Sequence, residues 1–263
     1  MKRLAFLVLV IFMLASCSSE TINQKDVKIK EGLADLEKCV SEAILSANKG
    51  SFLEGECAAE GNIILEKRED KDKITVYALT MYGEYGFENG IFTKISGTGI
   101  IPVAITFRKN ADGTYTLSEY KLPRDGAYYA DSVKKMFPQN LHERALNPSR
   151  EDNENLKNQE VAYAKEYLKK INRDAKISPD YVEKEFIEGM DVEASNTLLE
   201  TYSQYPYWIG TLEKIEDNTR YVYEKSYNKE EGIVTFKKYK FDTGEIVEKY
   251  DIKIEGANLI YLN

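Results

Sequence analysis

Histidine, cysteine and clustered carboxylates carry most acid–base, nucleophilic and metal chemistry, and this sequence of 263 residues uses the first two sparingly. It contains one histidine, His142, in the run Leu141-His142-Glu143-Arg144. No local motif ties a serine or cysteine nucleophile to that histidine, as a catalytic triad would require. Zinc sites need clustered His and Cys, which the sequence lacks. We therefore expect no catalytic residue, no metal ligand and no cofactor.

Carboxylates are abundant, with 44 acidic residues in the chain. A carboxylate pair for glycoside hydrolysis comes from distant positions in a sequence and leaves no local signature. Two acidic runs, at residues 69–72 and 151–154, lack the ligand spacing of an EF-hand calcium loop. An envelope hydrolase therefore stays open as an alternative to a binding protein.

The 19 tyrosines are the most unusual part of the composition. Tyrosine offers a flat apolar face and one hydroxyl group, which suits the binding of glycans or extended peptides. We expect a binding surface built from Tyr82, Tyr85, Arg124 and Tyr128. The alternative is that these tyrosines pack in half-buried strands, where the residue type is also common.

Two cysteines, Cys39 and Cys57, lie in the body of the chain. In an exported protein an even pair suggests a disulfide. Two reduced thiols that pack as small apolar side chains are the alternative.

The start of the chain has the features of an export signal. Lys2 and Arg3 precede an apolar run of about eleven residues, which is too short to span a membrane. Leu14-Ala15-Ser16-Cys17 then resembles the lipobox of bacterial lipoproteins. The resemblance implies a signal peptide at residues 1–16, acyl chains on Cys17, a lipidated tether at 17–26, and a location on the extracytoplasmic face of the membrane. Two or more acyl chains anchor a protein stably where one is marginal.

Net charge narrows the choice of partners. Removal of the signal peptide leaves 34 basic against 44 acidic residues, a net charge of about −10. Nucleic acid phosphates repel such a surface, so we expect no nucleic acid partner. The expected ligand is an unknown peptide, glycan or protein.

Periodicity predicts an α+β fold of two subdomains, each a helix followed by an antiparallel meander. The first, residues 27–147, has a helix at 27–48 and strands that alternate with turns such as Asn89-Gly90. The charged segment 148–156 is the expected linker. The second subdomain, residues 157–263, has helices and then five strands, at 208–215, 220–227, 233–241, 246–254 and 259–262.

Several segments of the first subdomain together suggest a family. They are TVYALTMYGEYGFENG at 75–90, IPVAITF at 101–107, YKLPRDGAYYA at 120–130 and LHERAL at 141–146. The region from Gly55 to Leu168 resembles the extracytoplasmic module that follows the membrane peptidase part of Gram-positive metallopeptidases of the beta-lactam sensor type. Stand-alone lipoproteins also carry similar regions. The peptidase activity of that family needs a zinc-binding H-E-x-x-H helix, and a chain with one histidine cannot form it.

These observations predict a non-enzymatic binding or sensory lipoprotein at the cell envelope. The envelope hydrolase is one alternative. A partner or inhibitor of a membrane sensor peptidase is another, and it rests on the resemblance alone.

Overall fold

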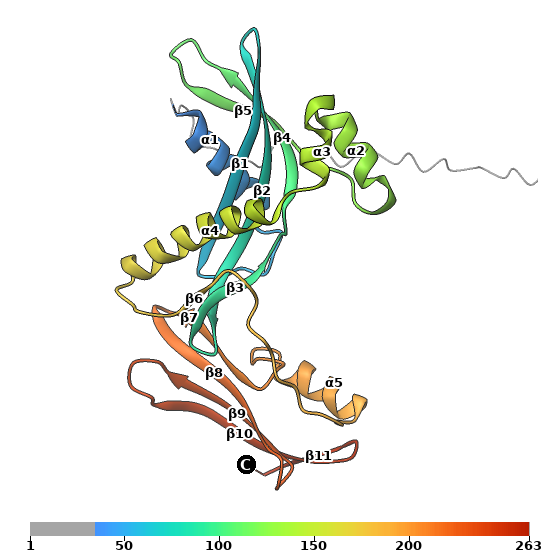
Figure 1. The fold of residues 1–263 in the computed structure, drawn as a ribbon. Helices are drawn as coiled ribbons and strands as arrows, with labels where there is room; N and C mark the ends of the chain where they lie inside the picture. Colours follow the sequence, from blue (N-terminus) through green and yellow to red (C-terminus); the bar gives the residue numbers. More distant parts are fainter. Residues whose placement is uncertain (1–34, 263) are drawn as a thin grey trace, which may run out of the picture.

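The computed structural model describes residues 35–262. Within this part of the chain, eleven strands belong to one hydrogen-bonded sheet, accompanied by five α-helices, which confirms the predicted α+β class (Figure 1). The predicted signal peptide, Cys17 and the tether at 17–26 lie outside the described residues, as does the first part of the predicted helix 27–48.

Strand β2 is the centre of the first half of the molecule. This half contains β1 (Cys57–Asp70), β2 (Lys73–Glu88), β3 (Ile91–Gly97), β4 (Ile101–Lys109) and β5 (Tyr115–Lys121). The 16-residue β2 pairs with β1 on one side and with β4 and then β3 on the other. Asn89 and Gly90 both have positive φ, 51° and 73°, and form the predicted tight turn into β3. From Ala78 onward every residue of β2 is buried, so both faces of the strand are covered.

Helices cover the two faces of this half in different ways. Helix α1 (Leu36–Asn48) packs Val40 and Ile44 against Val76 and Ile105 of the sheet. Helix α4 (Arg150–Lys170) lies across the opposite face, where residues such as Tyr85 and Leu79 point. Side chains alternate between the faces of a strand, so even-numbered positions of β2 meet α1 and odd-numbered ones meet α4.

The expected linker at 148–156 is wrong, because α4 runs through most of it. Ser149 caps the helix and forms a reciprocal capping box with Asp152, whose carboxylate also pairs with Arg144. The buried positions of α4 recur every four residues, at Asp152, Leu156, Glu160, Ala164 and Leu168. Acids occupy two of them, so a search for apolar periodicity misses the first half of the helix.

Helix α4 approaches β1 closely. A side chain at Gly61 would place its Cβ 2.5 Å from the backbone oxygen of Leu156, so only glycine fits under the helix. Next to it, the Gln159 side chain accepts a hydrogen bond from the backbone N–H of Asn62 (3.0 Å) and donates one to its carbonyl (2.9 Å).

Polar contacts also fix α4 to the sheet. Glu160 is fully buried, and its carboxylate pairs with Lys94 at 3.0 Å and accepts a hydrogen bond from the Tyr85 hydroxyl at 3.1 Å. Burial raises the pKa of Glu160 and lowers that of Lys94, and their mutual attraction opposes both shifts. Two further hydrogen bonds join Tyr163 to Glu60 and Tyr167 to Glu56.

Short helices extend the first half on the α4 face. The segment after β5 forms η1 (Gly126–Tyr128), α2 (Tyr129–Met136), η2 (Gln139–Leu141) and α3 (His142–Leu146). Val133, Phe137 and Ala145 form its small core, which packs against Tyr77 of β2.

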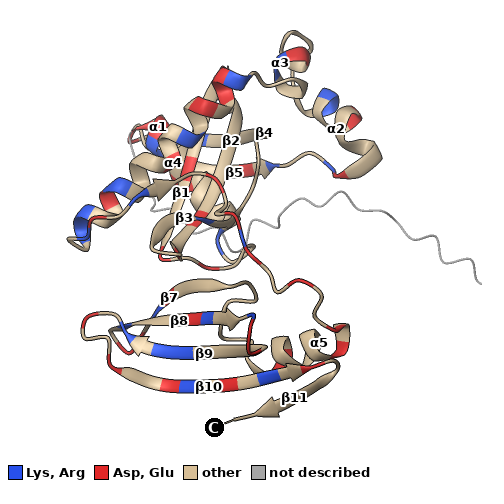
Figure 2. Ribbon diagram, turned by 60° about the horizontal axis from the view of Figure 1, so that its bottom comes forward, with Lys and Arg blue, Asp and Glu red and all other residues tan. Residues whose placement is uncertain are grey.

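The second half confirms the predicted five-stranded meander. After β6 (Ile177–Ser178) and α5 (Val192–Thr201) come β7 (Gly210–Glu216), β8 (Thr219–Asn228), β9 (Ile233–Lys240), β10 (Ile246–Glu255) and β11 (Asn258–Tyr261). Helix α5 packs Leu198 into a core with Tyr202, Phe236 and Ile252. Acidic and basic residues alternate along β10, and basic residues gather on β9 (Figure 2), where Lys237 pairs with Glu224 of the neighbouring β8.

The two halves meet through two short strand pairings, β2 with β7 and β3 with β6, and through a set of ion pairs. β2 pairs with β7 only at Glu88 and Leu212, so the sheet is narrow at this point. Arg220 of the second half forms a two-pronged contact with Glu56 of the first, and both Arg220 and Arg173 contact Glu213. Strands of both predicted subdomains therefore belong to one sheet.

Replacement of Glu160 by Ala is expected to lower the free energy of unfolding by about 3–5 kcal/mol, because it leaves the buried Lys94 ammonium without its counter-charge, with the Thr98 carbonyl oxygen as its remaining acceptor. Urea denaturation measures the change. Glu154→Ala on the same helix breaks the exposed Arg150–Glu154 pair and should cost about 0.5 kcal/mol or less. Equal losses in the two variants would contradict the assignment of Lys94–Glu160 as the main polar contact of α4.

Candidate functional site

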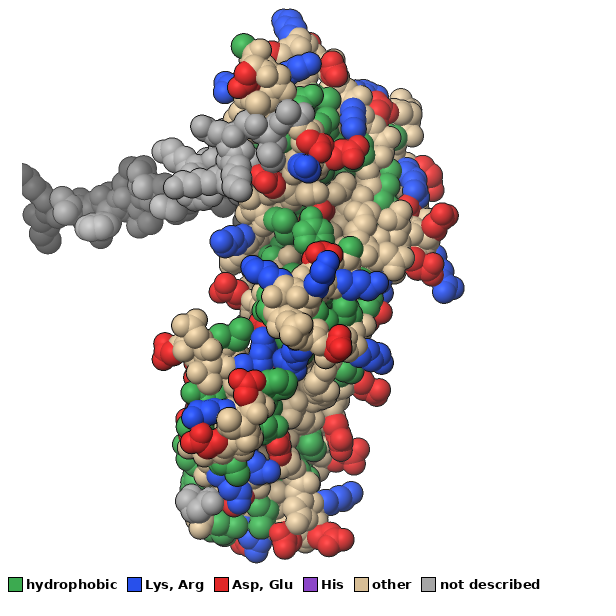
Figure 3. Space-filling model, turned by 90° about the vertical axis from the view of Figure 1, so that its left-hand side faces the viewer, with side chains coloured by type: hydrophobic (Ala, Val, Ile, Leu, Met, Phe, Trp, Pro, Cys, Tyr) green, Lys and Arg blue, Asp and Glu red, His purple; other side chains and the backbone are tan. Residues whose placement is uncertain are grey.

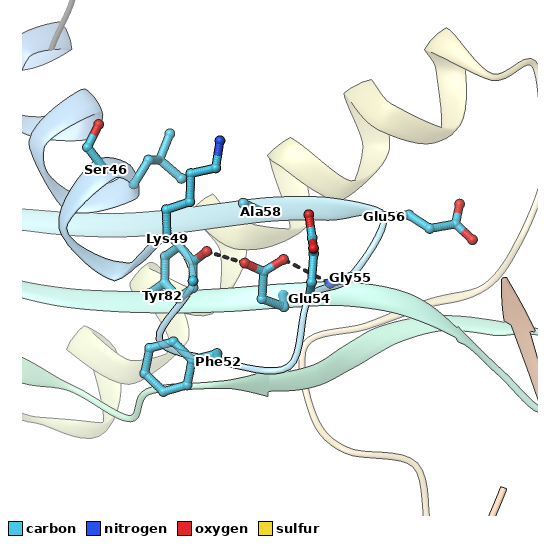
Figure 4. Close-up of a pocket in the computed structure, with 11 residues that line it drawn as sticks. Ser46, Lys49, Phe52, Glu54, Gly55, Glu56, Ala58 and Tyr82 are labelled. Carbon is cyan, nitrogen blue, oxygen red and sulfur yellow. Dashed lines mark hydrogen bonds between the residues drawn. The ribbon is translucent and has the colours of Figure 1, made fainter. Parts of the chain in front are cut away.

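A cleft opens on the α1 face of the first half, between the end of α1, the loop that follows it and strands β1 and β2 (Figure 4). Its volume is about 550 Å³, which lies in the range of sites for small ligands. Ser46 comes from α1 and Lys49 from the residue that caps its end, Phe52 and Glu54 come from the loop, and Tyr82 comes from β2.

The floor of the cleft contains a buried carboxylate. Glu84 of β2 is 6% exposed. One of its oxygens accepts a hydrogen bond from the Tyr82 hydroxyl, and the other accepts one from the backbone N–H of Gly55 at 3.1 Å. Within residues 35–262, no Lys, Arg or His side chain forms an ion pair with it. Buried carboxylates in proteins are usually paired with a cation, so Glu84 is unusual.

The loop reaches Glu84 because of a glycine. A Cβ at Gly55 would lie 2.5 Å from the backbone oxygen of Tyr85, so a larger residue would push the loop away from β2. The following N–H, of Glu56, donates to the same Tyr85 oxygen at 2.7 Å. These contacts hold the Gly55 N–H against the Glu84 carboxylate.

The walls combine aromatic and charged groups. The Phe52 ring lies 5.6 Å from the Tyr82 ring, with an angle of 34° between the planes. Glu54 and Lys49 are exposed at the rim. The Glu56 carboxylate points away from the cleft (Figure 4), toward its partner Arg220. Burial and the neighbouring Glu84 raise the pKa of Tyr82, so its hydroxyl stays protonated and donates to the carboxylate.

The predicted surface of Tyr82, Tyr85, Arg124 and Tyr128 does not form. Tyr82 and Tyr85 are three positions apart in one strand, so they point to opposite faces. Tyr82 is in the cleft, whereas Tyr85 is covered by α4. Arg124 and Tyr128 lie apart from both, before α2, where the guanidinium stands 4.7 Å from the centre of the exposed Tyr128 ring.

His142 lies at the start of α3, where a ring nitrogen is 2.9 Å from the carbonyl oxygen of Phe137. One form of the hydrolase alternative has an acidic residue holding this histidine near a serine, and the other has two facing carboxylates. Among residues 35–262, no group of three His, Cys, Asp or Glu side chains is arranged to hold a metal ion.

The two cysteines of the predicted disulfide lie in different clusters. Cys39 packs between α1 and the sheet, and Cys57 lies under α4, with its sulfur 3.9 Å from the Tyr163 carbonyl oxygen. No disulfide joins them in the described chain, so the alternative of two reduced thiols describes this structure. Their separate positions on opposite faces of the sheet are the physical reason.

Glu84 and the rim residues were not among the predicted site residues. The pattern MYGEYGF at 81–87 contained the relevant signal, because it places a carboxylate inside a strand that is otherwise apolar and aromatic. A charged residue in such a strand faces solvent, joins a buried polar contact as Glu60 and Lys94 do, or lies at a site, and only the positions of α1 and the loop decide between these outcomes for Glu84. Phe52, Glu54 and Lys49 had no such signal.

Cys57 should react slowly with alkylating agents in the folded protein. Burial, with the charges of Glu84 and Glu56, raises the pKa of its thiol from 9.0 to about 11. Iodoacetamide labelling at Cys57, followed by mass spectrometry, should have its midpoint near pH 11 in the native protein and near pH 9 in urea.

The thiol's contribution to stability is complete below pH 9 and is lost as the pH rises to 11. Glu84→Gln should lower the native labelling midpoint, because it removes a negative charge near the thiol. A native midpoint at pH 9 in the wild type would contradict the burial and the charges assigned to the surroundings of Cys57.

The surface of the described residues and the comparisons with known proteins do not connect this chain to a family. Figure 3 shows acidic, basic and apolar side chains interspersed over one face of the molecule. None of the helices in residues 35–262 has the length and apolar composition that a membrane span needs. Comparisons with protein-family models, curated proteins and solved structures found no match, so the family resemblance at Gly55–Leu168 stays a prediction from the sequence.

Proposed function

We propose that the protein is a lipoprotein anchored at the extracytoplasmic face of the membrane, and that it binds a positively charged ligand group in the cleft above Glu84. The lipobox-like run ending at Cys17 supports the anchor. The buried Glu84 carboxylate supports the binding site, and it is the observation that carries the proposal.

The argument for a cationic ligand is electrostatic. A carboxylate that is 6% exposed has lost most of its hydration, and two neutral donors replace only part of it. An ammonium group in the cleft would supply the charge that the protein does not. The faces of Phe52 and Tyr82 attract the same kind of group through their π systems.

The rim of this cleft suits a ligand that has an apolar group next to its positive charge. Phe52 and Leu45 provide apolar contact surface, and the exposed Glu54 adds a second negative charge. Lys49 is the one basic residue of the lining, so the cleft as a whole is acidic. A lysine side chain or an amino-terminal group of a peptide has this chemistry.

Binding of N-acetyl-lysine methylamide, followed by NMR titration of the full chain, tests the ligand class. Glu84→Gln keeps the shape of the floor and removes its charge, so affinity should fall at least about tenfold. The matched variant Glu143→Gln changes an exposed acid outside the cleft and should bind as the wild type does. The neutral isostere N-acetyl-norleucine methylamide should bind more weakly to the wild type.

Equal affinity for the two probes would overturn the cationic ligand, and so would failure of the lysine probe to bind at millimolar concentration. Unchanged binding in Glu84→Gln would place the ligand elsewhere.

The anchor is tested by metabolic labelling with palmitate. The wild type and Cys57→Ala should incorporate label, and Cys17→Ala should not, because the thioether forms on the thiol of Cys17. Label that persists in Cys17→Ala would show that the acyl chain is elsewhere.

A hydrolase is the second candidate, favoured by the presence of Glu54 and Glu84 in one cleft. Two carboxylates on either side of a scissile bond are what glycoside hydrolysis requires. Cleavage of a bound glycan or peptide by the wild type, lost in Glu54→Gln, would favour this candidate over a binding module.

A further inference from the structure

A second hollow lies in the other half of the molecule and is separate from the cleft at Glu84. It forms between residues 183–188 and the chain around Ile209 and Tyr227, with a volume of about 1090 Å³. Its lining combines two aromatic side chains, Phe186 and Tyr227, with aliphatic side chains and several charged ones.

Two neighbouring aromatic side chains beside this hollow are about half exposed to solvent. Phe186 is 52% exposed and Tyr207 is 51% exposed. Their ring centres are 5.8 Å apart, and the planes are inclined by 32°. Together the two inclined rings expose more apolar surface than either ring alone, at the margin of the hollow that Phe186 lines.

The two rings rest on a rigid base. Tyr207 packs edge-on against the buried Trp208 at 5.0 Å and 89°. The Lys184 ammonium lies 3.9 Å from the centre of the Trp208 ring and donates to the Glu88 carboxylate at 3.1 Å. The backbone N–H of Ile209 donates to the Glu185 carbonyl at 2.8 Å, which fixes the two segments to each other. Ordering the rings in advance lowers the entropic cost of binding.

Hydrogen-bonding groups surround the aromatic area. Glu183, Glu185 and Glu188 are exposed in the same lining. Lys229 is the exposed base, whereas Lys184 is engaged with Glu88 and Trp208. Exposed aromatic rings beside carboxylate acceptors suit a molecule with C–H groups on its ring faces and many hydroxyl donors, and the excess of carboxylates disfavours an anionic one.

We propose that this hollow binds a neutral oligosaccharide. Sugar rings stack on Phe186 and Tyr207, and their hydroxyl groups donate to the carboxylates of residues 183–188. β-1,4-linked sugars with equatorial substituents are the best fit, because both faces of each ring expose C–H groups. This inference does not rest on the cationic ligand proposed for the other cleft.

The chain contains its own reporter for this site. Trp208 is the only tryptophan in the sequence, and it touches Tyr207 and Lys184. A sugar on Tyr207 should therefore change the tryptophan emission of the full chain. Cellotetraose and chitotetraose are suitable neutral probes, with isothermal titration calorimetry as the second measurement.

We expect a saturable change in emission with at least one of the two tetrasaccharides. Phe186→Ala and Tyr207→Ala should each weaken binding about tenfold, because each removes one of the two exposed rings. Phe186→Tyr keeps the ring and should restore binding. Tyr128→Ala removes an equally exposed ring in the other half and should have no effect. Calorimetry is needed for Tyr207→Ala, since that change also alters the surroundings of Trp208.

The site would be overturned by the absence of saturable binding for both sugars at millimolar concentration, or by unchanged affinity in Phe186→Ala. Saturation by tetralysine in place of the sugars, abolished by Phe186→Ala, would assign the two rings to a peptide and also overturn the proposal. Glu84→Gln should leave sugar binding intact, so failure of the cationic site and failure of this one give different results.

Discussion

Hydrogen bonds from tyrosine hydroxyls to carboxylates hold this molecule together. Three of them cross the interface between α4 and the sheet: Tyr85 to Glu160, Tyr163 to Glu60, and Tyr167 to Glu56. A phenol can donate a hydrogen bond to a buried carboxylate only while the phenol keeps its proton. Burial favours the protonated form, because it raises the pKa of Tyr163 and of Tyr167 to about 12. The abundance of both tyrosine and acidic residues in the composition therefore has a structural use. With tyrosine hydroxyls as hydrogen-bond donors, the interior can hold buried carboxylates without a cation beside each one.

The same interaction explains why two buried glutamates differ. Glu160 has Tyr85 as donor and Lys94 as counter-charge, so its negative charge is balanced within the protein. Glu84 has Tyr82 as donor and a backbone N–H, but no counter-charge within residues 35–262. The first carboxylate joins a helix to the sheet, whereas the second faces an open cleft. Their difference comes from neighbours, not from residue type.

Sequence patterns predicted most of the strands but not the contacts that make the sites. The meander of the second half and the Asn89-Gly90 turn followed from local chemistry, because turn residues and β-branched or aromatic runs act over a few positions. The first half of α4 did not, because Asp152 and Glu160 occupy its buried stripe and their partners lie far away in sequence. The alternation of β2 separates Tyr82 from Tyr85, and it follows only from the full length of the strand, Lys73–Glu88. The hollow beside Phe186 depends on loop packing, for which the sequence has no periodic signal.

The Gln159 side chain has a consequence for the behaviour of the protein in solution. Strand β1 pairs with β2 alone among the described strands, so its outer edge offers free backbone groups to another chain. An amide side chain carries one acceptor and one donor in the arrangement of a peptide group, and at Asn62 it takes the place that a neighbouring strand would occupy. Docking of α4 thereby blocks intermolecular pairing at Asn62, in the first half of the β1 edge. Undocking of the helix would turn the longest hairpin of the fold into a template for self-association, so the contacts that stabilise α4 also protect the protein from aggregation.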